Sequence, residues 1–458
     1  MACASSFFFN SKMRCFFPGA AGRTRAKRLW ERAVFCPGQR LPRQNGVRSK
    51  GGAHGFVAAH TWPTLIPSHF LEKHTVHLCK SKASWAALAA TCLLAACGGS
   101  DSDTPLAPPV TRVQVVGDSL ADSGTFGFKF TVQGSAPTGA GATPLWSDHV
   151  ASRYGQSLCA HYRYKGTGSD FSTEPACTNR ATGNGRINYF MAPTSPLSVA
   201  RQLQDTAAAG YGAGDLVLVD GGGNDAADLI GAYLQASSDG GQAYAALLGT
   251  VLDAAAVNAA LAAGAPGLAQ AGAAYMDTLA AQFARTLLAQ TVARGAPRVA
   301  VLNAPPITLT PRFRTALGAV AAAQGAPAAA QAEALFDGWV RTFNARLASA
   351  LAGDARVVVV DFYSFFRSNL ANPAQAQLSN TTSAACPVTG VDASGLPAYT
   401  LAACSASALS ATAPPAGAPA GPDWWKQYVF ADGFHPTPYV HQLIGQLVAR
   451  SLTQAGWL

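Results

Sequence analysis

Three short motifs in this sequence hold side chains that can carry out chemistry. Gly-Asp-Ser-Leu stands at 117–120, Asp-Gly-Gly-Gly-Asn-Asp at 220–225 and Asp-Gly-Phe-His-Pro at 432–436. Together they supply a hydroxyl, an amide and a carboxylate–imidazole pair, which are groups used in nucleophilic catalysis. Each motif also has a simpler structural interpretation, so its place on the secondary-structure elements matters.

Ser119 is the candidate nucleophile. It directly follows a short apolar run, and a serine at the carboxyl end of a parallel strand lies at the edge where such sheets bind ligands. We expect the chain to enter a helix here, whose first N–H groups would stabilise an anion. Taken alone, the tetrapeptide is equally typical of a turn in which the serine caps a helix.

Asn224 and His435 are candidates for stabilising charge and for moving a proton. Glycines before Asn224 let a ligand approach the backbone, and its amide can donate to an oxyanion, although a glycine-rich turn explains the same residues. Asp432 precedes His435 by three residues, so its carboxylate can accept a hydrogen bond from Nδ1–H, which fixes the tautomer and leaves Nε2 free as a base. The other histidines after residue 97, none with a carboxylate at this spacing, are His149, His161 and His441.

An α/β fold would bring these motifs together. Short apolar runs typical of strands buried on both faces of a parallel sheet occur at 113–116, 216–219, 299–302 and 357–360. The Ala- and Leu-rich stretches 241–294 and 313–352 predict helices. This alternation predicts a three-layer α/β/α sandwich with a central parallel sheet. A helical insertion around 226–290 is expected to shape a substrate pocket or act as a lid, the alternative being a pair of scaffold helices.

The motifs, in this order, resemble the GDSL (SGNH) hydrolase family. Residues 117–120, 222–225 and 432–436 match its blocks, and Asn-Ala-Pro-Pro at 303–306 is similar to a segment of its lipase-like members. The resemblance covers about 113–458. It implies a flavodoxin-like α/β/α fold and hydrolysis of carboxylic esters.

One block departs from the family pattern. Where the family usually has Asn-x-Ala-x-Gly-Gly, this sequence has Asn-Arg-Ala-Thr-Gly-Asn-Gly-Arg at 179–186, with Asn184 in place of the second glycine. In members of that family, a backbone N–H of this block donates to the oxyanion. Asparagine can replace the glycine because it tolerates a positive φ better than most residues. Gly183 and Asn184 are therefore both candidates for this donor.

The resemblance also implies a mechanism. Ser119 attacks an ester carbonyl, His435 takes its proton, and Asp432 orients the imidazole. The Ser119 N–H, a backbone N–H of the block at 179–186 (block two) and the Asn224 amide hold the oxyanion. No metal or other cofactor is expected, because the sequence has no HExxH motif and no Cys/His cluster.

The substrate cannot be chosen from these motifs. Esters of lipids, short acyl esters and acetylated sugars all fit such a site. An O-acyltransferase or a carbohydrate acetylesterase could use the same residues. A non-catalytic binding protein of the cell envelope is the alternative from another class, and it has no need of the serine, asparagine, aspartate and histidine together.

The charge distribution argues against nucleic-acid binding. The formal net charge is +9, yet residues 1–82 contain 14 Lys and Arg against two Glu. Residues 83–458 therefore hold 19 basic and 22 acidic residues, a net charge of −3. The body of the protein has no cationic excess to attract phosphates.

The basic N-terminal region resembles an export signal. Two lysines, an apolar run and small residues precede Cys97, and Leu-Ala-Ala-Cys at 94–97 resembles a bacterial lipobox, although an ordinary signal peptide or an Ala-rich helix is the alternative. We expect a signal at 71–97, a lipid anchor at Cys97 that binds the membrane, and a polar, Pro-rich tether at 98–112. Residues 1–70 are expected to be a spurious or disordered extension. This places the protein in the bacterial cell envelope, at the outer membrane or outside the cell.

Four cysteines remain after Cys97, and an even number in an exported protein suggests disulfides. Each neighbouring pair is 18 residues apart. The simplest of three connectivities joins Cys159 to Cys177 and Cys386 to Cys404. Four free thiols are the alternative.

Overall fold

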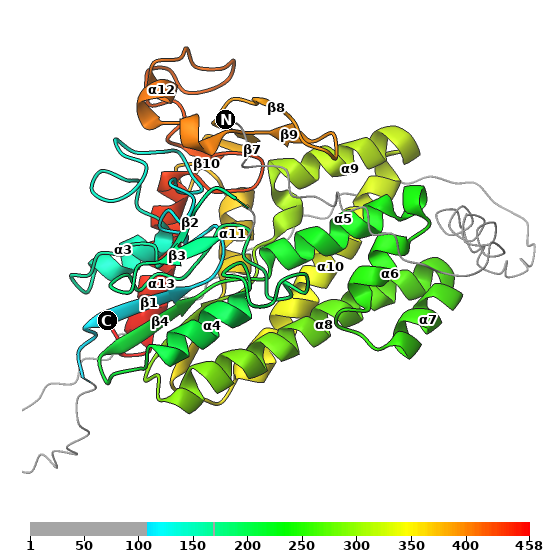
Figure 1. Cartoon of the computed structure of the whole chain (residues 1–458). Helices are drawn as coiled ribbons and strands as arrows, with labels where there is room; N and C mark the ends of the chain where they lie inside the picture. Colours follow the sequence, from blue (N-terminus) through cyan, green and yellow to red (C-terminus); the bar gives the residue numbers. More distant parts are fainter. Residues whose placement is uncertain (1–107, 168–169) are drawn as a thin grey trace, which may run out of the picture. The chain divides into compact units, whose positions relative to one another are not determined.

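The computed structural model describes residues 108–167 and 170–458, with a parallel sheet at their centre (Figure 1). Its strands are hydrogen-bonded in the order β1-β4-β5-β6 and all run parallel. They are β1 (Arg112–Val116), β4 (Asp215–Val219), β5 (Val299–Leu302) and β6 (Val357–Val360). The four predicted strands are confirmed, because short runs that are nearly continuous in apolar character suit strands covered on both faces.

Helices cover both faces of this sheet. In β4, Val217 and Val219 pack on one side while Leu216 and Leu218 pack on the other, since successive side chains of a strand alternate. The first side is covered by α4 (Val199–Ala208), α5 (Gly223–Asp239), α8 (Gly264–Gln290) and α10 (Ala326–Leu351). The second side is covered by α3 (Trp146–Ser152), α11 (Phe362–Ala371) and α13 (Pro438–Gln454). The predicted three-layer α/β/α sandwich is confirmed.

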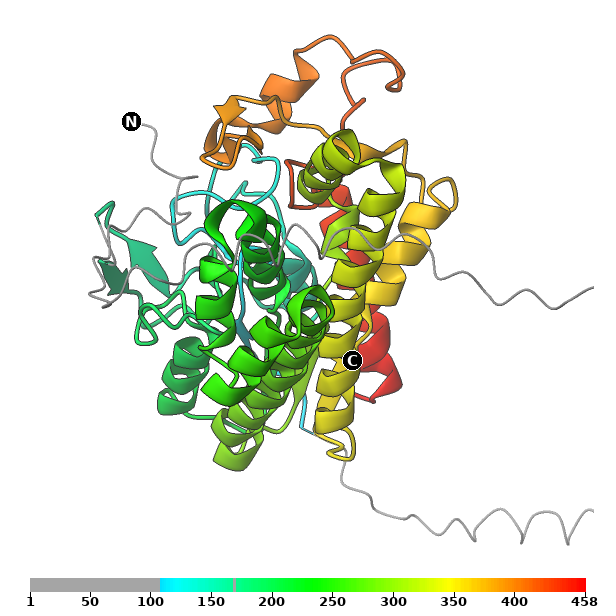
Figure 2. The same cartoon turned by 90° about the vertical axis from the view of Figure 1, so that its right-hand side faces the viewer.

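The predicted helical stretches are divided by glycines. Gly264 (φ +68°) is the first residue of α8, and Gly325 (φ +90°) separates α9 from α10, because both positions need a backbone that other residues rarely adopt. The other helices of the described residues are α6 (Gln242–Leu248), α7 (Ala254–Ala262), α9 (Pro311–Gln324) and α12 (Ala406–Ser410), with single turns at Val292–Arg294, Ile307–Leu309 and Leu401–Ala403. Figure 2 shows the molecule from the side on which the green and yellow helices of residues 223–351 lie. In α8, Tyr275, Met276 and Phe283 are buried in the core, which favours the scaffold interpretation for this part of the insertion.

The helix expected after Ser119 does not form, and this prediction was wrong. The first described helix, α3, begins only at Trp146. Instead, the Asp118 carboxylate accepts the Leu120 N–H at 3.0 Å, and the Asp122 carboxylate accepts the Thr125 N–H at 2.7 Å. These side chains capture the N–H groups locally, so the segment folds as consecutive turns.

Among the described residues, three small two-stranded sheets lie outside the central sheet, and none of them was predicted. They pair β2 (Tyr162–Tyr164) with β3 (Phe171–Thr173), β7 (Asn380–Ala384) with β10 (Tyr428–Phe430), and β8 (Gly390–Val391) with β9 (Pro397–Ala398). β10 is the one that matters for the motifs, because it leads directly into 432–436.

The N-terminal predictions lie outside the described residues. These are the extension at 1–70 and the signal at 71–97 with Cys97. Of the tether predicted at 98–112, residues 98–107 also lie outside the described part. Within residues 108–167 and 170–458, no helix combines the length and apolar character needed to cross a membrane.

Candidate active site

Ser119 lies at the carboxyl end of β1, where the chain turns away from the sheet. Its side chain is almost fully buried, at 2% exposed. The Oγ atom lies 2.8 Å from Nε2 of His435, although 316 residues separate the two in sequence. The fold therefore brings the first and last motifs into direct contact.

His435 is held on its other side by Asp432. Nδ1 of His435 lies 2.8 Å from one carboxylate oxygen of Asp432, and the other oxygen accepts the N–H groups of Phe434 and His435 at 2.7 and 2.6 Å. Burial alone would raise the pKa of Asp432, but the charge of His435 and these hydrogen bonds outweigh it and lower that pKa. The carboxylate thus stays ionised beside the imidazole.

Asn224 stands in the first turn of α5, at the carboxyl end of the neighbouring strand β4. Gly221 (φ +153°) and Gly222 (φ +93°) make the sharp bend between strand and helix. The Asn224 amide donates one hydrogen bond, of 3.0 Å, to the Gly185 carbonyl. It therefore connects the second motif, at 220–225, to the block-two turn, and its second N–H is available for another acceptor.

The block-two turn distinguishes between its two candidate donors. The Gly183 N–H donates to Asp122 at 2.7 Å, and the Gly185 N–H donates to the Thr182 carbonyl at 2.9 Å. Asn184 has φ +61° and is exposed, and its N–H makes no hydrogen bond within the part of the chain that the structure describes. Gly183 is already engaged, so Asn184 is the available N–H of the two.

An aromatic ring fits between this turn and the histidine. The Phe130 ring centroid lies 5.1 Å from that of His435. The same ring occupies the space that a Cβ atom on Gly183 would need, so only glycine is accommodated there. Nothing in the sequence pattern identified Phe130, because both contacts are long-range.

The start of α5 holds the block-two loop with charged groups that the sequence analysis missed. Asp225 accepts the N–H groups of Ile187 and Asn188 at 3.0 and 2.8 Å. Asp228 forms an ion pair with Arg186, and Arg186 donates to the Asn184 carbonyl at 2.7 Å. The helical spacing of Asp225 and Asp228 was the one available signal.

Two buried carboxyl groups, those of Asp118 and Asp220, lie next to the turn that carries Ser119. The Asp220 carboxyl accepts the Asp118 N–H at 2.7 Å and faces the Trp146 indole N–H at 3.3 Å. Burial, with the charge of Asp118 added, raises the pKa of Asp220 well above its usual value. A Cβ atom on Gly117 would collide with Asp220, which explains the glycine of the first motif.

The sequence matches the family described as GDSL-like Lipase/Acylhydrolase over residues 113–448. The chain belongs to this family. The predicted family is confirmed, and this GDSL-like protein is a hydrolase that acts on ester bonds. A comparison with curated proteins gave no match.

In this GDSL-like hydrolase a side-chain hydrogen bond also joins two neighbouring strands of the central sheet. The Asn303 amide donates to Asp361 at 2.9 Å, which joins the ends of β5 and β6. Among the described residues, no group of three or more His, Cys, Asp or Glu side chains could hold a metal ion.

Both expected disulfides are present in the structure. They join Cys159 to Cys177 and Cys386 to Cys404. Each closes a segment with a sequence separation of 18 residues. They lie on separate loops that flank the sheet, one before the block-two turn and one before β10.

Proposed function

We propose that this hydrolase is a serine esterase in which Ser119, His435 and Asp432 cleave carboxylic esters. The observation that carries the proposal is the continuous chain of contacts between these three residues, with 2.8 Å from Oγ to Nε2 and 2.8 Å from Nδ1 to the carboxylate. A serine hydroxyl is a weak nucleophile unless a base is within hydrogen-bond reach, and this arrangement supplies that base.

Each proton has a defined path in this mechanism. Ser119 Oγ attacks the ester carbonyl carbon while its proton passes to Nε2 of His435, and Asp432 stabilises the resulting imidazolium. His435 then gives that proton to the departing alcohol, which leaves an acyl-serine. A water molecule, deprotonated by the same Nε2, attacks the acyl group, and the proton returns to Oγ as the acid is released.

The oxyanion is proposed to be held by three donors. They are the N–H of Ser119, the N–H of Asn184 and the side-chain amide of Asn224. Support for Asn184 over Gly183 comes from the Gly183 hydrogen bond to Asp122. Such donors lower the barrier because they are fixed before charge develops on the oxygen.

We further propose that the enzyme is a lipoprotein of the bacterial cell envelope, anchored through Cys97. The lipobox-like Leu-Ala-Ala-Cys at 94–97 and the two disulfides support this, since disulfides persist in oxidising compartments. In this scheme 71–97 is the signal, 98–112 is the tether and 113–458 is the hydrolase domain.

The catalytic proposal is tested by Ser119→Ala. The variant should fold normally and lose ester hydrolysis, because the attacking oxygen is gone. Activity is measured with p-nitrophenyl esters of increasing chain length, beside acetylated xylan. A phosphonofluoridate should label the Ser119 peptide of the wild type; undiminished activity in the variant, or labelling elsewhere, would overturn the assignment.

A further inference from the structure

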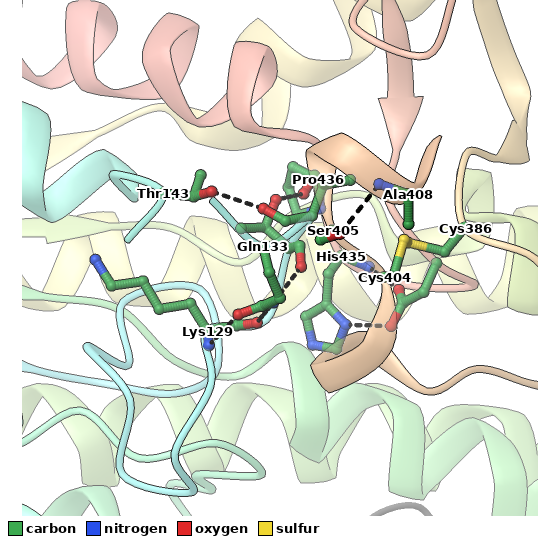
Figure 3. The surroundings of a disulfide bond; sticks show 12 residues. Lys129, Gln133, Thr143, Cys386, Cys404, Ser405, Ala408, His435 and Pro436 are labelled. Carbon is green, nitrogen blue, oxygen red and sulfur yellow. Dashed lines mark hydrogen bonds and ion pairs between the residues drawn. A yellow bond between two sulfur atoms is a disulfide. The ribbon is translucent and has the colours of Figure 1, made fainter. Parts of the chain in front are cut away.

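The disulfide Cys386–Cys404 lies beside the loop that carries Asp432 and His435 (Figure 3). Both cysteines are buried, at 3% and 4% exposed. The Cys386 N–H donates to the Ala431 carbonyl at 2.8 Å, and the Ala431 N–H donates to the His435 carbonyl at 2.8 Å. One half of the disulfide is therefore two backbone hydrogen bonds away from the base.

The other half of the disulfide is joined to a different loop. The Gln133 N–H donates to the Cys404 carbonyl at 2.8 Å, and the Gln133 side-chain amide closes its own loop by donating to the Thr131 carbonyl at 2.7 Å. This loop carries Phe130, whose ring packs against the His435 imidazole. The imidazole is thus supported by two loops, one bound to each cysteine.

We propose that the Cys386–Cys404 disulfide is a positioning element for His435. By joining the two supporting loops it keeps Nε2 within reach of Ser119 Oγ. The sulfur atoms have no contact with reacting atoms in this proposal, which rests on the proposed role of His435 as the base. Productive proton transfer depends on this alignment, so a small displacement of the ring costs rate more than binding.

The second disulfide is a matched control. Cys159–Cys177 closes a segment of the same length, so both disulfides restrict the unfolded chain to a similar degree. The segment that follows Cys177 is fixed to β1 independently, because the Val115 N–H donates to Thr178 and the Arg180 N–H donates to Val115, at 3.1 and 2.8 Å. Losing this disulfide should lower stability without displacing His435.

The experiment compares Cys386→Ala/Cys404→Ala with Cys159→Ala/Cys177→Ala at a temperature where circular dichroism shows both folded. We expect the first variant to lose about tenfold or more in kcat with KM within about twofold, and the control to keep kcat within about twofold. Phosphonofluoridate labelling of Ser119 should slow in parallel with kcat. Hydrogen exchange at 431–437 should accelerate in the first variant alone.

Equal changes in kcat and in exchange for the two variants would overturn the inference. If the first variant does not fold, Gln133→Leu removes the side-chain hydrogen bond to the Thr131 carbonyl in the loop that carries Phe130, while the backbone bond to Cys404 and the disulfide stay intact. A lowered kcat with unchanged KM then supports the inference, and a normal kcat overturns it. Failure of the proposed mechanism gives a different result, because Ser119→Ala would then remain active.

Discussion

At the scale of single residues, Asn224 combines a structural contact with a proposed chemical one. One of its amide hydrogens is bound to the Gly185 carbonyl, so the amide is fixed before substrate arrives. The other is free to meet an oxyanion. These two roles predict different consequences when the side chain is removed.

Asn224→Ala should lower kcat by about 10²–10³ with a smaller change in KM, because the lost donor acts mainly in the transition state. Asn224→Asp should be at least as harmful, since it sets a carboxylate against the oxyanion. The measurement is kcat and KM on one activated ester, with circular dichroism to verify folding.

Asn188→Ala provides the control for this prediction. Its amide also anchors the block-two loop, but it binds Thr250 and Tyr275 at 2.6 and 3.0 Å. We expect a loss of stability with kcat close to that of the wild type. A folded Asn224→Ala enzyme within about threefold of wild-type kcat would remove Asn224 from the oxyanion hole.

The residues that the sequence predicted are those in contiguous motifs. Ser119, Asp432 and His435 stand beside glycines, acids and strand ends that indicate their surroundings. Asp122 and Phe130 have no such local signal. Their contacts with Gly183 and His435 span 61 and 305 residues in the chain, so only the folded structure identifies them.

At the scale of elements, the first turns of α5 fasten the block-two loop to the central sheet. The Asp225 carboxyl is buried at 2% exposed and accepts two N–H groups of that loop. Burial raises its pKa to about 6, although these hydrogen bonds oppose the shift. This contact therefore responds to pH near neutrality.

The sign of this response follows from proton linkage. An unfolded aspartate ionises near its ordinary value, whereas folded Asp225 binds its proton up to about pH 6. The group stabilises the fold below the unfolded pKa, and that stability is lost as the pH rises through about 6. The free energy of unfolding should fall by up to about 3 kcal/mol from this group between about pH 4 and pH 7.

Urea denaturation of the wild type and Asp225→Asn across this range isolates the contribution. The variant lacks the titrating carboxyl, so the difference in free energy of unfolding between the two proteins should change with pH in the stated direction. A difference that stays constant, or that favours the wild type more at higher pH, would contradict the assignment to Asp225.

The strands of the central sheet, which are covered by helices on both faces, were predicted well from the sequence. β5 and β6 have the expected bounds because their short, continuous apolar runs, Val-Ala-Val-Leu and four valines, are typical of strands in a parallel sheet. The turn after Ser119 was predicted wrongly because Asp118 and Asp122 bind backbone N–H groups that a helix would have used. The short pairs such as β7 with β10 depend on partners far away in sequence.

At the scale of the whole molecule, we expect ester hydrolysis and membrane attachment to depend on different parts of the chain. The family match begins at residue 113, after the proposed anchor at Cys97 and its tether. Cys97→Ser should therefore release the protein from membranes with unchanged specific activity. Detergent phase partitioning checks the first part and ester hydrolysis the second; a variant that still partitions with detergent has another membrane contact.

The direction of β1 places the entry of the chain and Ser119 at opposite edges of the central sheet. Arg298 donates to the Pro108 carbonyl and the Thr111 N–H donates to Gly214, so the chain enters at the amino edge of the strands. The five residues of β1 then span about 17 Å before Ser119. The proposed tether at 98–112 therefore reaches the sheet at the edge remote from the serine, where Arg298 binds the Pro108 carbonyl. The sheet therefore acts as a rigid spacer between the point where the chain enters it and the edge that carries Ser119.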